Sequence, residues 1–133
     1  MRASEVMVAD PIVAAAGATS SEVAALMRSK NIAVVPVVDN PKDRRYLGTI
    51  SDRDILAQCV GAGHNPATCS AAGHARDDTP VVKPDTELQG YQVARQLDAD
   101  DHHVRSTIVV VDGDRKVVGF IPYPEQVRGI VIV

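Results

Sequence analysis

The order of apolar and polar residues along the chain predicts a series of alternating helices and strands. Thr19 and Glu22 match the spacing of a capping box, and apolar residues recur behind them at helical spacing, so we expect a helix that ends at Asn31. Residues 33–38 form a continuous apolar run, which predicts a strand buried on both faces. Pro36 within this run cannot donate a ladder hydrogen bond, so we expect it at a sheet edge or at a deliberate break.

The pattern continues with a second strand and a second helix. A polar loop at 40–45 leads into a strand at 46–50, and Ser51 opens a helix that we expect to reach about Val60. A linker at 63–78, rich in small and polar residues, follows this helix. We expect one short helix inside the linker, near Ala71.

A second, degraded copy of the same pattern follows the linker. Gly119 lies 71 residues after Gly48, and Asp112 lies 73 residues after Asp39, within similar apolar surroundings. We expect a short strand at 80–82 and a helix that begins at Asp85 or Thr86. Two strands, at about 107–112 and about 116–121, are joined by a tight turn, and a last short helix begins near Pro124.

These elements predict an α/β (α+β) fold made of two βαββα repeats. The first repeat spans 1–62, the linker 63–78 and the second repeat 79–133. Neither repeat can bury its apolar sheet face alone, so we expect the two to pack sheet to sheet about a pseudo-two-fold axis as one module.

Composition narrows the classes of function. Hydrophobic residues make up 45% of the chain and aromatic residues 3%, so the core must consist of Val, Ile, Leu and Ala. The net charge of −3 and the scarcity of aromatics argue against nucleic acid as a partner. Since no apolar run is long enough for a membrane span and the first residues lack a signal-peptide core, we expect a cytoplasmic protein with reduced cysteines and no membrane partner.

The segment 48–54 concentrates the polar chemistry of the chain at a strand-to-helix junction. A carboxylate such as Asp54 can accept both protons of a ribose cis-diol, and the free amides of a helix N-terminus attract phosphate. Arg53 adds a bidentate donor beside them. The alternative is that Ser51 and Asp54 only cap their own helix, although capping and binding can coexist. In the second copy Pro122 replaces Ser51 and Glu125 replaces Asp54, so we expect a degraded site there.

The cysteines and two of the histidines raise the question of a metal. Cys59, His64, Cys69 and His74 recur every five residues, but zinc sites more often contain a close pair of cysteines. We therefore expect no metal site and interpret Cys59 as a core thiol. No nucleophile–base spacing and no nucleotide-binding glycine motif is present, so we also expect no catalysis and no cofactor.

The segments 35–39 and 48–54, repeated in order, resemble the CBS domain family in its tandem form, the CBS pair or Bateman module. The resemblance covers about residues 5–128, and the linker is most similar to that of small stand-alone actinobacterial CBS-pair proteins of the hypoxic-response type. It implies a homodimeric stress-response sensor that binds an adenosine compound (AMP, ADP, ATP, S-adenosylmethionine or NAD) as a regulatory ligand between the repeats. Because no effector domain is visible, we expect it to signal in trans to an unknown protein partner.

The resemblance also implies roles for individual residues. Asp54 would hold the ribose hydroxyls, Ser51 would contact ribose or phosphate, and Arg53 would neutralise phosphate. The base pocket would be formed by the strand backbone and by the entering segment, at Ala33, Val34, Val35, Pro36, Ile12 and Val13. Two alternatives stay open: a ligand-independent dimeric interaction or structural protein of the same fold, and, more weakly, a metal- or redox-responsive module.

Overall fold

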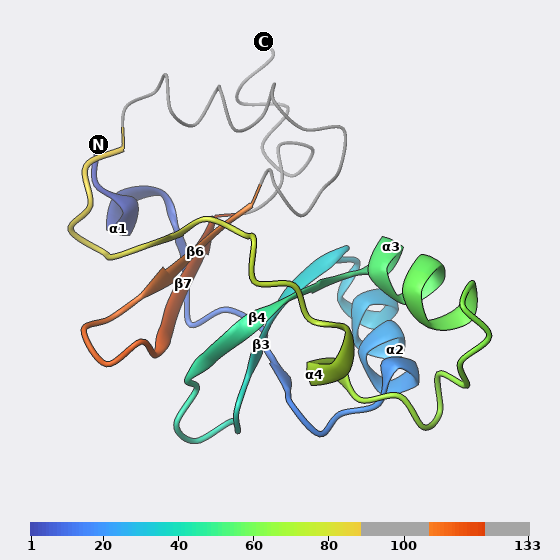
Figure 1. The fold of residues 1–133 in the computed structure, drawn as a ribbon. Coiled ribbons are helices and arrows are strands. Elements are labelled where there is room, and N and C mark those ends of the chain that lie inside the picture. The colour runs from blue at the N-terminus through green and yellow to red at the C-terminus, as the bar shows by residue number, and fades with distance from the viewer. Residues whose placement is uncertain (89–106, 122–133) are drawn as a thin grey trace, which may run out of the picture. The chain divides into compact units, whose positions relative to one another are not determined.

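The computed structural model describes residues 1–88 and 107–121, and the chain divides into two compact units (Figure 1). One unit contains Ile12–Asp78, and the other combines Met1–Pro11 with Thr79–Val133. The expected mixed α/β fold is confirmed. The boundaries of these units are not those of the expected repeats. Val8 and Ala9 pair with Phe120 and Gly119, whereas residues 63–78 belong to the unit Ile12–Asp78.

The unit Ile12–Asp78 contains a three-stranded sheet with the order β2–β3–β4. Strand β3 pairs in parallel with β2 and antiparallel with β4. Every residue of β3 is buried, as the continuous apolar run predicts. The bounds are β2 Ala14–Ala15, α2 Ser20–Lys30, β3 Val34–Val38, β4 Tyr46–Ser51, α3 Asp52–Asp54, the π-helix η1 Ile55–Val60 and α4 Ala71–His74. The buried core comprises Ala14, Val23, Met27, Val35, Val37, Ile50, Ile55 and Ala71.

Helix α2 begins and ends as its sequence predicts. The Thr19 hydroxyl accepts a hydrogen bond from the Glu22 amide at 3.1 Å, and the Glu22 carboxylate accepts one from the Thr19 amide at 3.0 Å. This backbone hydrogen bond lowers the pKa of Glu22 below its ordinary value. Asn31 ends the helix in the left-handed conformation, with φ at 54°.

Of the two positions that we expect for Pro36, the sheet edge is wrong, because β3 is the central strand of its sheet. Pro36 lies opposite Thr49, whose N–H and C=O both bond to the backbone of Arg76 instead of β3. Facing residues of an antiparallel pair exchange either both ladder bonds or none. Pro36 and Thr49 exchange none, so the missing N–H of proline costs no hydrogen bond on this side. On its other side β3 pairs with β2 only at Val37 and Val38, so β2 forms no pair with Pro36.

The other unit repeats this strand arrangement and adds one strand. Strand β6 pairs in parallel with β5 and antiparallel with β7, and a register shift follows Val110 just as one follows Val37. Gly48 and Gly119 occupy equivalent positions, opposite Val37 and Val110. The sheet order is β1–β7–β6–β5, with bounds α1 Ala3–Val6, β1 Val8–Ala9, β5 Val81–Val82, β6 Ile108–Val111 and β7 Val117–Ile121.

The helix that we expect from Asp85 or Thr86 does not begin there. Glu87 forms an antiparallel bridge with Arg2, and the Leu88 amide bonds to the carbonyl of Met1, so this segment pairs with the N-terminus. The rest of that helix, the last short helix from Pro124, and both residues of the degraded site, Pro122 and Glu125, lie outside the described residues.

Candidate functional site at the β4–α3 junction

Ser51 and Asp54 lie at the junction between β4 and α3 and are almost completely buried, with 1% and 2% of their surface exposed. The Ser51 hydroxyl accepts a hydrogen bond from the Asp54 amide at 3.1 Å. One carboxylate oxygen of Asp54 accepts a bond from the Ser51 amide at 3.0 Å. The two residues therefore form the capping box that the sequence allows, whatever else they do.

The second oxygen of the Asp54 carboxylate contacts a residue that sequence analysis missed. Arg76 Nη1 lies 3.3 Å from Asp54 Oδ1, and its Nη2 lies 3.4 Å from the exposed Asp78. The Arg76 backbone exchanges two hydrogen bonds of 2.8 Å with Thr49, which places this side chain beside the junction. Arg76 lies in the segment that we interpret as a linker, and no sequence pattern there indicates a contact with Asp54.

The expectation of free amides at this helix N-terminus is wrong. The Asp52 amide donates to the carbonyl of Ala33 at 2.9 Å, and the Asp54 amide donates to Ser51. The Arg53 amide donates to the Asp52 carboxylate at 2.7 Å. Since these three first-turn amides have partners and α3 is only three residues long, the backbone offers no ready phosphate site.

The remaining expected site residues are only partly brought together. Val34 pairs with Ser51 across the β3–β4 ladder, so the start of the buried strand, including Val35 and Pro36, lies beside the junction. Ile12, which is 39% exposed, and the half-buried Val13 directly precede β2.

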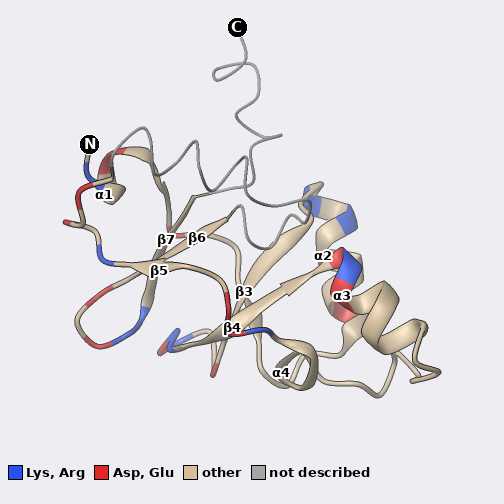
Figure 2. Cartoon of the chain, turned by 45° about the horizontal axis from the view of Figure 1, so that its top comes forward, with Lys and Arg blue, Asp and Glu red and all other residues tan. Residues whose placement is uncertain are grey.

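The charge pattern around α3 also bears on the expected roles. Figure 2 shows a basic residue between two acidic ones on α3, namely Arg53 between Asp52 and Asp54. The Arg53 side chain is exposed, whereas Asp54 is buried. Arg76 is therefore the cation that directly contacts the buried carboxylate.

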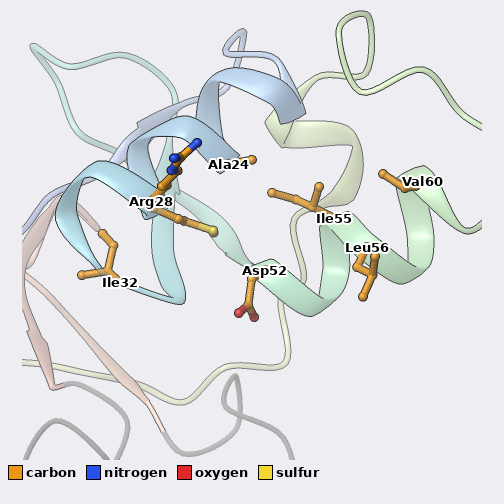
Figure 3. Close-up of a pocket in the computed structure, with 8 residues that line it drawn as sticks. Ala24, Arg28, Ile32, Asp52, Ile55, Leu56 and Val60 are labelled. Atoms are coloured by element: carbon orange, nitrogen blue, oxygen red, sulfur yellow. The ribbon is translucent and has the colours of Figure 1, made fainter.

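An apolar groove of about 360 Å³ lies between α2 and the α3–η1 segment (Figure 3). Leu56 and Val60 line it and are 66% and 50% exposed. The lining residues are Ala24, Met27, Arg28, Ile32, Asp52, Ile55, Leu56 and Val60. The groove is therefore an apolar surface open to solvent, and such contiguous surfaces mark interaction sites when they are large enough.

Three of the cysteine and histidine side chains that we did not expect to bind a metal lie together. The ligand atoms of Cys59, Cys69 and His74 are all within 4.8 Å of one another. Burial raises the pKa of the Cys69 thiol above its ordinary value, and the adjacent Cys59 side chain raises it further. The expectation that Cys59 is buried is confirmed. Its Sγ atom nevertheless lies close to possible metal-ligand atoms of Cys69 and His74, which the interpretation as a core thiol does not predict.

The fold matches that of a known class of protein. The family model for the CBS domain matches residues 3–61 of the chain. The chain is similar to Hypoxic response protein 1 of Mycobacterium tuberculosis, with 28% identity over 110 residues, which cover 83% of this chain and 71% of the relative.

Solved structures show the same fold. The crystal structure of Hypoxic Response Protein I with two coordinated zinc ions has a TM-score of 0.75 at 22% identity, covering 96% of this chain and 98% of that one. The structure of CBSX2 in complex with AMP has a TM-score of 0.73 at 21% identity, covering 98% of this chain and 96% of that one. The tandem CBS fold predicted from the sequence is therefore confirmed. Within the described residues, no helix is long and apolar enough to cross a membrane.

Proposed function

We propose that this CBS-domain protein is a homodimeric sensor that binds an adenosine-containing ligand at the β4–α3 junction and signals to a partner protein. The observation that carries the proposal is a carboxylate, Asp54, that is 98% buried at the end of the matched strand–helix motif. AMP bound to a protein of the same fold, CBSX2, supports this class of ligand. The ligand is regulatory, and we expect neither a cofactor nor catalysis.

The unused hydrogen-bonding capacity of the junction suits a ribose. A carboxylate offers about four acceptor positions, and Asp54 uses one for the Ser51 amide and one for Arg76. The remaining positions can accept the two hydroxyl protons of a ribose. The Ser51 hydroxyl accepts one bond and keeps its own proton to donate.

Arg76 is a better candidate than Arg53 for the phosphate contact. Its side chain is 31% exposed, so part of the guanidinium is accessible while Nη1 lies against Asp54. A guanidinium has five N–H donors in a planar fork and can hold a carboxylate and a phosphate together. The adenine would then lie toward the start of β3 and toward Ile12 and Val13, as the family resemblance implies.

Two matched capping variants separate ligand binding from simple helix capping. Ser51→Ala and Thr19→Ala each remove a hydroxyl that caps a helix, at α3 and at α2, and we expect each to cost about 1 kcal/mol of stability. Thermal shift measured with AMP, ADP, ATP, S-adenosylmethionine and NAD then gives the ligand response. A ligand at 100 times its Kd stabilises the wild type by about 2.7 kcal/mol, and we expect Thr19→Ala to keep this shift and Ser51→Ala to lose most of it.

The competing function is a ligand-independent interaction protein, in which Ser51 and Asp54 only cap α3. It is favoured by the capping box that both residues form in the structure. Equal ligand shifts in Ser51→Ala and Thr19→Ala, or no shift in the wild type with any of the five compounds, would support this alternative.

The groove between α2 and η1 supports the proposed homodimer. A second copy would cover Leu56 and Val60, which are large apolar side chains facing solvent. We expect light scattering after gel filtration to give a dimer for the wild type and a monomer for Leu56→Glu. Leu47→Glu is the matched control, because Leu47 is 44% exposed on β4 but does not line the groove, and it should remain dimeric. A dimeric Leu56→Glu would exclude this surface as the interface.

A further inference from the structure

We infer that Cys59, Cys69, His74 and His64 form a tetrahedral zinc site in the unit Ile12–Asp78, separate from the β4–α3 junction. Two thiolates and two imidazoles are a preferred ligand set for zinc. The site needs no residue of the proposed ligand-binding site. The zinc site can therefore be tested independently of the proposed function.

Three of the four ligands already lie at nearly the required separation. The Sγ atoms of Cys59 and Cys69 and a ring nitrogen of His74 are mutually within 4.8 Å. Around a tetrahedral zinc, with Zn–S at about 2.3 Å and Zn–N at about 2.0 Å, ligand atoms are about 3.3 to 3.8 Å apart. Movements of about an ångström, within the reach of side-chain rotation, would bring the three atoms onto one ion.

His64 is positioned to complete the set. Its ring centroid lies 5.6 Å from that of His74, with an angle of 38° between the ring planes. Two imidazoles bound to one tetrahedral zinc have centroids about 5 Å apart, so the observed separation fits a shared ion. His64 is exposed and Cys59 is buried, so the four side chains extend from the surface into the unit.

The backbone between these residues is fixed by hydrogen bonds. The His64 amide bonds to the carbonyl of Cys59 at 2.9 Å, and the Cys69 amide bonds to the carbonyl of Asn65 at 3.1 Å. The Ser70 hydroxyl caps α4 by accepting from the Gly73 amide at 3.1 Å, which places His74 at the end of that helix. These bonds hold together four ligands that are otherwise spread over sixteen residues of sequence.

The π-helix η1 gives a second reason to regard this region as functional. The Gly61 amide bonds to the carbonyl of Leu56, five residues earlier, and this wider turn ends just after Cys59. Short π-helical segments are rare and often occur at functional sites. Zinc bound here would join the end of η1 to α4 across the intervening loop.

The test is zinc binding by the full chain, kept reduced and first freed of metal with a chelator. We expect one zinc per chain in competition with a chromophoric chelator, and cobalt substitution should give thiolate charge-transfer bands with the intense visible bands of tetrahedral Co²⁺. Cys69→Ser and His74→Ala should each weaken zinc binding at least about 100-fold, since even residues that only support metal ligands cost 10–100-fold when changed. His64→Ala should weaken it as well.

Thr68→Ala is the matched control, because Thr68 precedes Cys69 and bonds to the carbonyl of Asn65 but is not a ligand. We expect its zinc affinity to equal that of the wild type. Substoichiometric zinc uptake by the wild type, octahedral cobalt spectra, or unchanged affinity in Cys69→Ser or His74→Ala would overturn the site. Unchanged affinity in His64→Ala would overturn the assignment of His64 as the fourth ligand. The cobalt spectrum needs no variant, so a variant that fails to fold does not remove the test.

Discussion

Asp54→Ala lowers the free energy of unfolding by about 2 to 3 kcal/mol. The substitution removes one half of the α3 capping box and leaves the buried Ser51 amide without its partner, which costs about 1 to 3 kcal/mol. It also removes the contact between Arg76 and Asp54, but because Arg76 is 31% exposed and still contacts Asp78, water and Asp78 compensate for most of that loss. Urea denaturation of the wild type and the variant measures the difference.

A double-mutant cycle isolates the contribution of the ion pair within this effect. We expect Arg76→Ala to be destabilising, and the double variant Asp54→Ala with Arg76→Ala to be less destabilised than the sum of the single variants. Asp78→Ala is the control, since the Asp78 side chain is 46% exposed and its contact with Arg76 should contribute no more than about 0.5 kcal/mol. Strict additivity of the two single variants would show that Arg76 does not interact with Asp54 in solution.

Gly48→Ala destabilises the protein by about 1 to 3 kcal/mol, which is the usual cost of overpacking. A Cβ atom at Gly48 would lie 2.7 Å from the carbonyl oxygen of Arg76, and a backbone atom cannot rotate out of the way. The segment carrying Arg76 would have to move away from β4, which weakens its contact with Asp54. Denaturant unfolding together with the ligand thermal shift should therefore show both lower stability and a smaller response.

Gly119→Ala is the matched comparison, since Gly119 occupies the equivalent position in the other sheet. There the new Cβ meets the Met7 side chain, whose flexible thioether can adopt another rotamer. We expect a loss of about 1 kcal/mol or less and an unchanged ligand response. A larger loss at Gly119 than at Gly48 would contradict this explanation of the two glycines.

The strand pairs and their repetition could be predicted because their signals are local. The apolar run 34–38 and the later run 108–111 are strand-length stretches, each followed by an aspartate, and each precedes a second strand that contains a glycine. The capping box of Thr19 and Glu22 is equally local, since both partners lie within one helical turn. Such features depend on neighbouring residues and so can be recognised without the tertiary structure.

The features that the sequence did not reveal depend on contacts between distant residues. Arg76 reaches Asp54 across 22 positions because its backbone pairs with Thr49, and no periodic pattern encodes such a bridge. Cys59 and His74 lie 15 positions apart, and only the folding of the loop and α4 brings their ligand atoms together. The sheet edge is wrong for Pro36 because a proline is tolerated in this central strand only through the hydrogen bonds of Thr49, which go to Arg76.

The capping box formed by Ser51 and Asp54 means that these two residues alone do not indicate ligand binding. Ser51 and Asp54 have a complete structural role at the start of α3, so their residue types would be needed there even without a ligand. The proposal of ligand binding therefore depends on the burial of Asp54, on the nearby Arg76 and on the CBS match, and requires a direct measurement.

Equilibrium dialysis of the full chain against AMP, ADP, ATP, S-adenosylmethionine and NAD is that measurement, because it detects binding whatever its enthalpy. We expect at least one of the five compounds to bind saturably at the β4–α3 junction. Asp54→Ala, under conditions where it is folded, should lose that binding, whereas Thr19→Ala should retain it. No saturable binding of any of the five compounds by the wild type, or undiminished binding by Asp54→Ala, would contradict the account.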